Sequence, residues 1–186
     1  ASSSTYRREL LQRLNLPFSC ASPDIDESAQ PQEHPEQLVC RLAEAKARAL
    51  CAQYSQHLII GSDQVAALDR QILGKPHDLK RATAQLQAAS GRSVTFYTGL
   101  TVLNSQTGKC QTDCIPFTVH FRTLSKQQIL RYLTTEQPFD CAGSFKSEGL
   151  GVSLFRATQG DDATSLIGLP LIRLVDMLNN EGISIP

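Results

Sequence analysis

The chain has 186 residues, 18 of them basic and 18 acidic, so its formal net charge at pH 7 is zero. This length suits one domain, or two lobes that share a sheet, and the neutral charge argues against nonspecific binding to nucleic acid or to membrane surfaces. No apolar run approaches the roughly 20 residues of a membrane span, and the six cysteines form no C-x-x-C pair that would favour a zinc site. The sequence therefore predicts a cytoplasmic protein with free thiols and with neither a membrane nor a nucleic acid as partner.

The first predicted elements are a helix over residues 6–14, a short strand near residues 18–21 and a loop over residues 22–28. Leucines recur on one face of the helix, and Ser4 or Thr5 is placed to cap it. Acidic residues and prolines make the third segment a loop. Because the sequence opens directly onto a helix, we also expect an apolar strand ahead of its first residue.

A long helix is predicted next, from about Pro35 to Tyr54. Proline suits the first turn of a helix, where its missing N–H has no helical partner to lose. An apolar stripe marks the face that is buried. Its members are Val39, Leu42, Ala49 and Leu50. Lys46 falls on the same stripe, so its ammonium either reaches water from the edge of the stripe or has a specific partner.

The apolar run from His57 to Val65 predicts a buried strand that holds Asp63 at its end. Open α/β sheets bind ligands at strand ends, but Gly, Ser and Asp are also ordinary strand terminators. Asp63 is therefore either a functional acid or a simple stop. A hairpin is predicted over residues 65–73, with its turn at Asp69 and Arg70.

The remaining predicted elements alternate between helices and strands. Capping residues and glycines mark the helix ends, and alternating apolar residues mark the strands. The expected helices cover residues 79–90 and 126–134 and begin again at Pro170, and the expected strands cover residues 93–103, 111–121 and 151–157. Because strands are followed by strands as well as by helices, we expect an α/β fold with a mixed, twisted sheet flanked by helices.

Hydroxyl groups and arginines gather at the start of the first helix. Ser2 and Ser4 precede backbone N–H groups that have no helical partner, and Arg7 and Arg8 follow in the first turn, where a cation opposes the helix dipole. A bound phosphate would relieve that conflict, whereas a serine cap beside solvated arginines needs no ligand. Lys75, in a Gly-Lys-Pro turn, can likewise point at a phosphate or simply lie exposed.

Acidic residues in the loop over residues 22–28 are candidate metal ligands. Asp24, Asp26 and Glu27 could supply oxygens to magnesium or manganese, although most acidic loops are merely solvated. The chain has no G-x-x-x-x-G-K-[ST] loop and no G-x-G-x-x-G. A nucleotide would therefore have to be held by other means.

These segments, in this order and spacing, resemble the Maf-like nucleotide pyrophosphatases over nearly the whole chain. Ser2-Ser-Ser-Thr-Tyr-Arg7 is similar to the family's S-x-S-P-x-R opening, with Thr5 in place of proline, and Gly61-Ser-Asp63-Gln64 is similar to its G-[AS]-D segment. The other matching segments are Asp26-Glu27, Glu44-Ala-Lys46-Ala, Gly74-Lys75-Pro76, Thr98-Gly99, Ala142-Gly143 and Gly168-Leu169-Pro170. The family begins with an L-I-L-A-S strand, in agreement with the strand expected before the first helix.

The resemblance implies one Maf-like domain over residues 1–186, with two lobes and a nucleotide cleft between them. It also implies hydrolysis of a nucleoside triphosphate to a monophosphate and pyrophosphate, with Asp63 as the proton acceptor. A divalent cation, magnesium or manganese, would be held by Glu27 and Asp63. Phosphate binding would fall to Ser2, Ser4, Arg7, Lys46 and Lys75. Because the family often dimerises, a homodimer is implied as well.

Tyr6, Gln64 and Glu148 resemble the branch of the family that acts on 7-methyl-GTP. Guanine offers two adjacent N–H donors that the Glu148 carboxylate could accept, and the positive charge of 7-methylguanine favours an acid and an aromatic face. The plainer interpretation of Glu148 is a solvated loop acid. The alternative functions are hydrolysis of another modified or noncanonical nucleotide, and a non-catalytic nucleotide-binding regulator of cell division.

Overall fold

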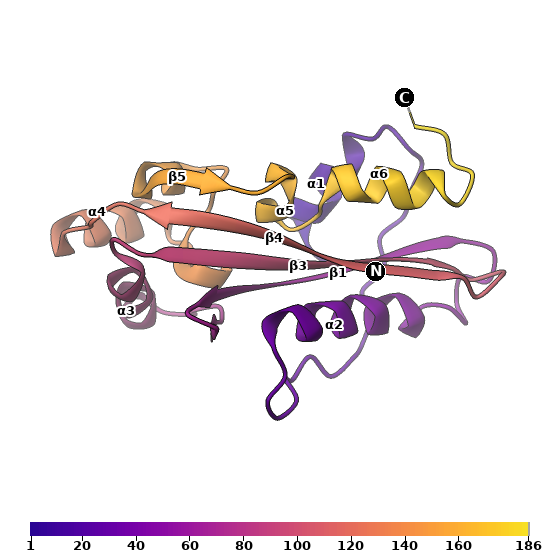
Figure 1. Ribbon diagram of the computed structural model, residues 1–186, viewed down its shortest axis with the longest axis horizontal. Coiled ribbons are helices and arrows are strands. Elements are labelled where there is room, and N and C mark those ends of the chain that lie inside the picture. Colours follow the sequence, from indigo (N-terminus) through magenta and orange to yellow (C-terminus); the bar gives the residue numbers. More distant parts are fainter. Residues whose placement is uncertain (186) are drawn as a thin grey trace. The chain divides into compact units, whose positions relative to one another are not determined.

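The computed structural model describes residues 1–185 and contains a five-stranded sheet with the strand order β2-β1-β3-β4-β5 (Figure 1). The strands are β1 (Leu58–Leu68), β2 (Gln71–Leu73), β3 (Ser93–Asn104), β4 (Cys110–Phe121) and β5 (Phe155–Gln159). Strand β1 pairs antiparallel with β2, and β4 pairs antiparallel with β5. The predicted long strands on either side of Gly108 are confirmed.

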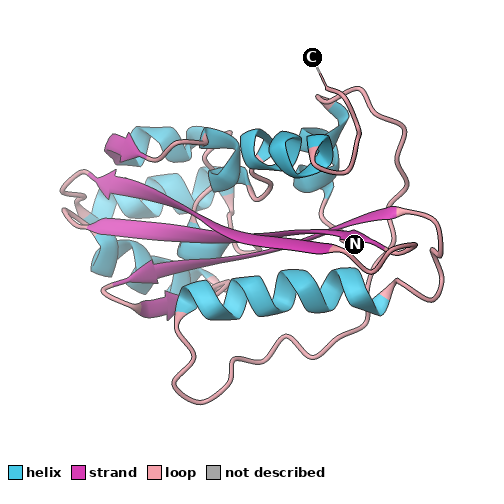
Figure 2. Cartoon of the chain, turned by 45° about the vertical axis from the view of Figure 1, so that its right-hand side comes forward, coloured by secondary structure: helices cyan, strands magenta, loops and turns pink. Residues whose placement is uncertain are grey.

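Helices connect and flank these strands (Figure 2). The α-helices of the described chain are α1 (Thr5–Gln12), α2 (Pro35–Ala49), α3 (Leu79–Ala89), α4 (Lys126–Glu136), α5 (Ala163–Ile167) and α6 (Leu171–Asn179). Two short 3-10 helices, η1 (Ala142–Ser144) and η2 (Leu150–Leu154), precede β5. The predicted α/β class is confirmed.

Polar side chains begin several helices where the sequence predicts them. Ser4 accepts a hydrogen bond from the backbone N–H of Arg7 at the start of α1, and Asp78 and Ser125 cap α3 and α4 in the same way. Helix α6 begins directly after Pro170. The short helix α5 was not predicted, and Asp162 caps it.

Strand β1 is longer than predicted, and this changes the position of Asp63. The strand continues from Leu58 to Leu68 and turns into β2 at Asp69 and Arg70, which have φ values of 48° and 69°. The predicted hairpin is confirmed, but the prediction that Asp63 ends its strand is wrong. A buried acid can lie mid-strand here because a cation from α2 faces it, as described below.

Three other predicted boundaries are wrong. Residues 18–21 form no strand, because their contact with the start of the chain is one hydrogen bond, from the N–H of Ser2 to the carbonyl of Ala21 at 2.8 Å. Helix α2 ends at Ala49 and not near Tyr54 as predicted. Ala49, which was expected on the buried stripe, is exposed in its last turn. The strand expected over residues 151–157 begins only at Phe155, after η2.

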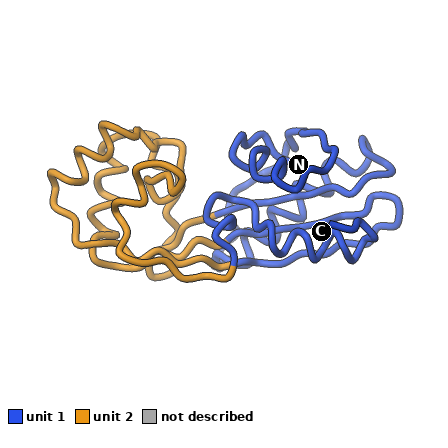
Figure 3. The backbone as a smooth tube through the Cα atoms, turned by 90° about the horizontal axis from the view of Figure 1, so that it is seen from above, with its two compact units in different colours: residues 1–64, 98–115, 162–186 blue, residues 65–97, 116–161 orange. Residues whose placement is uncertain are grey.

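The chain forms two compact units, shown in separate colours in Figure 3. The first contains residues 1–64, 98–115 and, within the described chain, 162–185. The second contains residues 65–97 and 116–161. The strands β1, β3 and β4 each contribute residues to both units. The predicted cleft between two lobes, and the strand expected ahead of α1, stay predictions.

In the first unit, helix α2 covers one face of the sheet, and α1, α5 and α6 cover the other (Figure 1). On the α6 side the core contains Leu10, Leu100, Val102, Leu174 and Met177. On the α2 side it contains Ala47, Leu50, Ile59 and Leu103. Burial of these apolar side chains is the main favourable term that holds the helices on the sheet.

Two glycines let α2 approach the sheet at backbone distance. A Cβ atom at Gly61 of β1 would lie 2.0 Å from the carbonyl oxygen of Ala43, and one at Gly99 of β3 would lie 2.1 Å from that of Val39. Both distances are far shorter than any van der Waals contact, so any other residue would push the helix away. The glycines of the Gly-Ser-Asp and Thr-Gly segments therefore set the height of α2 above the strands.

The second unit has an aromatic core. Phe145 lies at the centre, with edge-to-face contacts to Phe96, Phe121 and Phe155 at centroid separations of 5.2, 5.5 and 4.8 Å. Helix α3 packs against α4 and η1 in the same unit. This unit carries Lys75 and Glu148.

Within residues 1–185, no helix has the length and apolar character needed to cross a membrane. All six cysteines are free thiols, as predicted.

Candidate active site

Side chains alternate along β1, and the alternation assigns its polar residues to different faces of the sheet. Gly61 and Asp63 face α2, because a Cβ at Gly61 would meet the α2 backbone and the Asp63 carboxylate reaches Lys46 of that helix. Ser62 and Gln64 face the other way. The Ser62 hydroxyl donates to the carbonyl of Gly168 at 3.0 Å, and the side-chain amide of Gln64 donates to the carbonyl of Ser165 in α5.

On the α2 face, Lys46 joins two carboxylates. Its Nζ lies 2.6 Å from Oδ1 of Asp63 and 2.8 Å from Oε1 of Glu27. The side chains of Lys46 and Asp63 are only 8 % and 11 % exposed, whereas that of Glu27 is 60 % exposed. We call these three residues the acid–lysine cluster. The ammonium on the apolar stripe of α2 therefore has a buried partner and does not simply reach water.

Arg7 is held beside this cluster by contacts from both ends of the chain. Its Nε donates to the carbonyl of Gly168 at 2.8 Å, and its Nη1 lies 3.5 Å from the hydroxyl of Ser2. Burial lowers the pKa of Arg7, and the negative charges of Asp63 and Glu27 act in the opposite direction. Because burial removes part of its hydration, the guanidinium of Arg7 is well suited to pair with an anion.

The hydroxyls before α1 are already arranged around the helix start. Ser4 accepts from the N–H of Arg7 at 3.3 Å, and the hydroxyl of Ser2 accepts from the N–H of Ser4 at 3.1 Å. The predicted grouping of Ser2, Ser4 and Arg7 is thus present as a structural arrangement. Their binding of phosphate stays a prediction.

A divalent cation fits the acid–lysine cluster only with help from a substrate. No group of three or more His, Cys, Asp or Glu side chains able to hold a metal occurs among the described residues. Asp63 and Glu27, however, lie within hydrogen-bond reach of one ammonium, and magnesium is commonly bound by one or two carboxylates together with substrate phosphates. The donor set therefore fits magnesium or manganese completed by phosphate oxygens.

The other acids proposed from the sequence are not part of this cluster. Asp26 is exposed and accepts a hydrogen bond from the N–H of Ser28 at 2.9 Å, which forms a local turn. Asp24 is also exposed. Among the three acids of the loop, the structure therefore selects Glu27.

Lys75 and Glu148 belong to the second unit and are both exposed. Glu148 accepts a hydrogen bond from the hydroxyl of its neighbour Ser147 at 2.9 Å. Tyr6 is half-buried on α1 in the first unit. The predicted roles of Lys75, Glu148 and Tyr6 stay predictions.

Gln64 has partners that the sequence did not predict. Its Nε2 lies 2.9 Å from Oγ1 of Thr98, 2.7 Å from the carbonyl oxygen of Ser165 and 3.3 Å from that of Leu166. Thr98 and Ser165 are completely buried. The signal in the sequence was the threonine that directly precedes Gly99, the glycine of β3 on which α2 packs.

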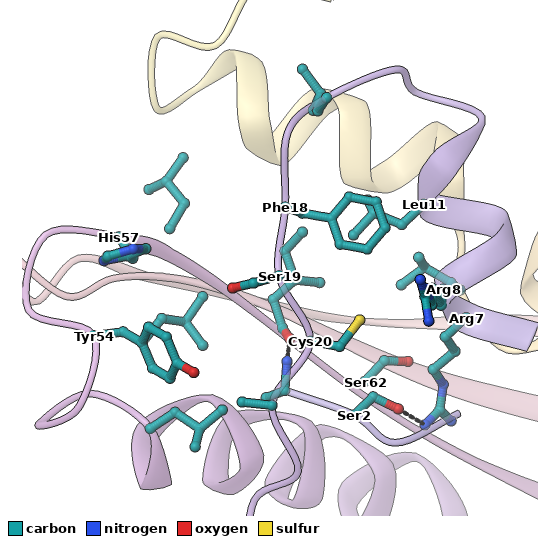
Figure 4. A pocket seen from close by; sticks show the side chains of 18 of the residues that line it. Ser2, Arg7, Arg8, Leu11, Phe18, Ser19, Cys20, Tyr54, His57 and Ser62 are labelled. Carbon is teal, nitrogen blue, oxygen red and sulfur yellow. Dashed lines mark hydrogen bonds between the residues drawn. The ribbon is translucent and has the colours of Figure 1, made fainter. Parts of the chain in front are cut away.

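A cavity of about 460 Å³ lies in the first unit. Figure 4 shows Ser2 and Arg7 at one end of it and Tyr54 and His57 at the other. Most of the remaining wall is apolar, and none of the described residues that line it belongs to the acid–lysine cluster. Its apolar body is therefore unsuited to a polyphosphate, which needs cations along its length.

The family model described as "Maf-like protein" matches residues 1–181, and the chain belongs to the Maf-like family. The predicted family is confirmed.

The chain is 69 % identical over 186 residues to a 7-methyl-GTP pyrophosphatase of Pseudomonas syringae pv. syringae, an alignment that covers 100 % of this chain and 97 % of that protein. It is 66 % identical to a 7-methyl-GTP pyrophosphatase of Pseudomonas aeruginosa, with the same coverage. A protein of the same name from Nitrosococcus oceani is 58 % identical over 182 residues, which are 98 % of this chain and 92 % of that protein.

Proposed function

We propose that this chain hydrolyses 7-methyl-GTP to the nucleoside monophosphate and pyrophosphate. Three similar proteins that the chain matches over nearly their whole length are named for this activity. The structural observation that supports it best is the ion pair between Lys46 and Asp63, which holds a carboxylate in the middle of a buried strand. A buried acid held by a cation from another element is a common feature of catalytic sites.

Asp63 is the residue that moves the proton. In the reaction, the oxygen of a water molecule bonds to the α-phosphorus, and the bond from the α-phosphorus to the oxygen that bridges it to the β-phosphorus breaks. The water loses a proton to the carboxylate of Asp63, and the bridging oxygen leaves with pyrophosphate. Since Oδ1 is held 2.6 Å from Lys46, the carboxylate is fixed in one orientation before substrate binds.

Lys46 and Arg7 both supply positive charge near Asp63 and Glu27. Their charges balance those of Asp63 and Glu27, so the four side chains together are formally neutral. A triphosphate adds several negative charges, and these need further cations to be neutralised. A bound magnesium or manganese ion would supply that charge and polarise the phosphate oxygens. Glu27 and Asp63 are the residues that would hold it.

The other roles that the sequence predicts form part of the same proposal. We place Lys75 on the phosphates and Glu148 and Tyr6 on the base, and we infer that both units act as one Maf-like domain. We also place the protein in the cytoplasm, as a homodimer. The homodimer is checked by sedimentation equilibrium of the purified chain, where a monomer mass would remove it from the proposal.

Release of pyrophosphate from a panel of triphosphates tests the activity. With magnesium or manganese present, we expect 7-methyl-GTP to be hydrolysed faster than dTTP or UTP, and a chelator to stop the reaction. Asp63→Asn should lower the rate by a factor of about 10² to 10⁴, the usual contribution of a general base, with an unchanged circular dichroism spectrum. Asp24→Asn is the matched control, because Asp24 is an exposed acid outside the cluster.

Each alternative function has its own outcome in this assay. A near-normal rate for Asp63→Asn would remove Asp63 from its role. Faster hydrolysis of another modified nucleotide would change the assigned substrate but leave the enzyme class as proposed. Absence of pyrophosphate release with every triphosphate would favour the non-catalytic regulator.

A further inference from the structure

We propose that Thr98, with the carbonyl groups of Ser165 and Leu166, fixes the side-chain amide of Gln64 so that only its oxygen is available to a ligand. Gln64 then acts as a hydrogen-bond acceptor and never as a donor. The part that concerns substrate rests on the proposed function, because it assigns this oxygen to the base of the nucleotide. The part that concerns the amide's orientation rests on the contacts of the first unit alone.

The neighbours of the Gln64 amide are all acceptors. The carbonyl oxygens of Ser165 and Leu166 can only accept. Thr98 has a single hydroxyl proton, and it donates this proton to the carbonyl of Ser165 at 2.9 Å. Towards Gln64 the hydroxyl can therefore only accept as well. The atom that faces all three oxygens must be the NH₂ nitrogen, so the orientation of the amide follows from the network itself.

The carbonyl of Ser165 cannot turn away from this arrangement. It accepts a third hydrogen bond, from the N–H of Gly168 at 3.0 Å, and the hydroxyl of Ser165 donates to the carbonyl of Asp162 at 2.6 Å. The carboxylate of Asp162 in turn accepts from the N–H groups of Thr164 and Ile172, both at 2.8 Å. Asp162 is 3 % exposed. The frame around Gln64 is thus buried and hydrogen-bonded at each position.

The free end of the amide is Oε1. Both protons of Nε2 are used by the three oxygens, so Gln64 has no donor left for a ligand. Oε1 takes no part in these three contacts, which all involve Nε2. It is therefore the atom of the half-buried Gln64 amide that is left for a ligand. A ligand group that binds there must bring an N–H or O–H.

The base edge that this oxygen fits is one with N–H donors. Guanine presents two of them side by side, N1–H and the 2-amino group, whereas an edge that offers only acceptors would face Oε1 with repulsion. Thr98 is then a positioning residue: it touches Gln64 and not the base. Its loss should weaken recognition of the base and leave binding of the phosphates as it was.

The orientation of the amide is tested by hydrogen exchange alone. Both N–H protons of Nε2 are hydrogen-bonded in this orientation. In NMR spectra we therefore expect them to exchange with solvent more slowly than the side-chain amide protons of the exposed Gln53. Gln64→Met identifies the pair of signals by their loss.

Exchange of the Gln64 amide protons as fast as that of Gln53 would overturn the assigned orientation. This readout needs no activity, so it stands even if the chain does not hydrolyse 7-methyl-GTP. Conversely, an active enzyme whose Gln64 amide protons exchange freely would reject the inference and leave the proposed function in place.

The role of Thr98 is tested by kinetics with two variants. Thr98→Val keeps the shape of the side chain and removes the hydroxyl, and Thr98→Ser keeps the hydroxyl and removes the methyl group. We expect Thr98→Val to raise KM for 7-methyl-GTP about 2- to 10-fold, the effect of one hydrogen bond, with kcat changed less than about twofold. Inorganic pyrophosphate has no base and can contact only the residues that bind phosphate. Its inhibition of Thr98→Val should therefore equal its inhibition of the wild type. Thr98→Ser should restore the wild-type KM.

Two results would refute a positioning role for Thr98. One is a Thr98→Val enzyme with wild-type KM. The other is a parallel loss of kcat and of pyrophosphate inhibition, which would show a general structural defect and no specific effect on the base.

Discussion

Replacing Lys46 with methionine tests whether its ion pairs stabilise the buried acid of β1. Methionine keeps much of the apolar stem but removes the ammonium that lies 2.6 Å from Asp63. Because the Asp63 side chain is only 11 % exposed, its carboxylate would be left almost buried and without its ion-pair partner. Removing one partner of a buried pair typically destabilises the fold by about 3–5 kcal/mol. The second contact, to Glu27, adds little because that side chain is 60 % exposed.

The measurement is the free energy of unfolding in urea, followed by circular dichroism, together with the melting temperature. A loss of this size corresponds to a fall in Tm of roughly 10 °C for a chain of this length. Glu27→Gln is the matched control, and we expect it to change stability by less than about 1 kcal/mol. The double variant Lys46→Met/Asp63→Asn should recover much of the loss, because it leaves no bare buried carboxylate.

Two outcomes would show the reasoning to be wrong. One is a free energy of unfolding of Lys46→Met within about 1 kcal/mol of the wild type, which would show that solvent reaches Asp63 and screens its charge. A double variant no more stable than Lys46→Met would show that lost packing, and not the unpaired carboxylate, causes the effect.

Gly61→Ala should destabilise the protein by about 3 kcal/mol or more, because its Cβ would lie 2.0 Å from a backbone oxygen of α2. Gly74→Ala is the control and should change the free energy of unfolding little, because its Cβ would meet no atom within 4 Å. Equal effects of the two substitutions would contradict the close-packing argument. The Glu181 side chain is only 5 % exposed, and its hydrogen bonds from Lys109 and Asn104 lower its pKa. The contribution of ionised Glu181 to the stability of the fold should therefore be complete above the usual glutamate pKa of 4.5. It should be lost as pH falls through the lowered pKa of the folded state. The Tm difference between wild type and Glu181→Gln should shrink in acid, and a constant difference down to about pH 2 would contradict this.

Local sequence signals predicted most of the elements because their causes are local. Capping by Ser4, Asp78 and Ser125 depends on residues three positions apart, and the turn at Asp69 and Arg70 depends on two adjacent residues. The predicted strand at residues 18–21 failed for the opposite reason. A short apolar segment becomes a strand only where a partner offers a ladder of hydrogen bonds, and the partner found here supplies one.

The candidate site was predicted in its members more than in its arrangement. Asp63, Lys46 and Glu27 were each proposed from the sequence, but their meeting at one ammonium depends on how closely α2 packs on β1. The contacts of Gln64 with Thr98 and Ser165 were not predicted, because they join residues 34 and 101 positions away along the chain.

The sequence by itself determined the family, the residue types available for phosphate chemistry and the order of most helices and strands, since each follows from motifs or from patterns over a few residues. The tertiary structure decided which side of the sheet each residue serves. Alternation along β1 sends Asp63 to Lys46 and its neighbour Gln64 to the opposite face, and the bare backbone at Gly61 lets α2 come close enough for the ion pair to form. Charge could stay buried in mid-strand only because that partner arrived from another element.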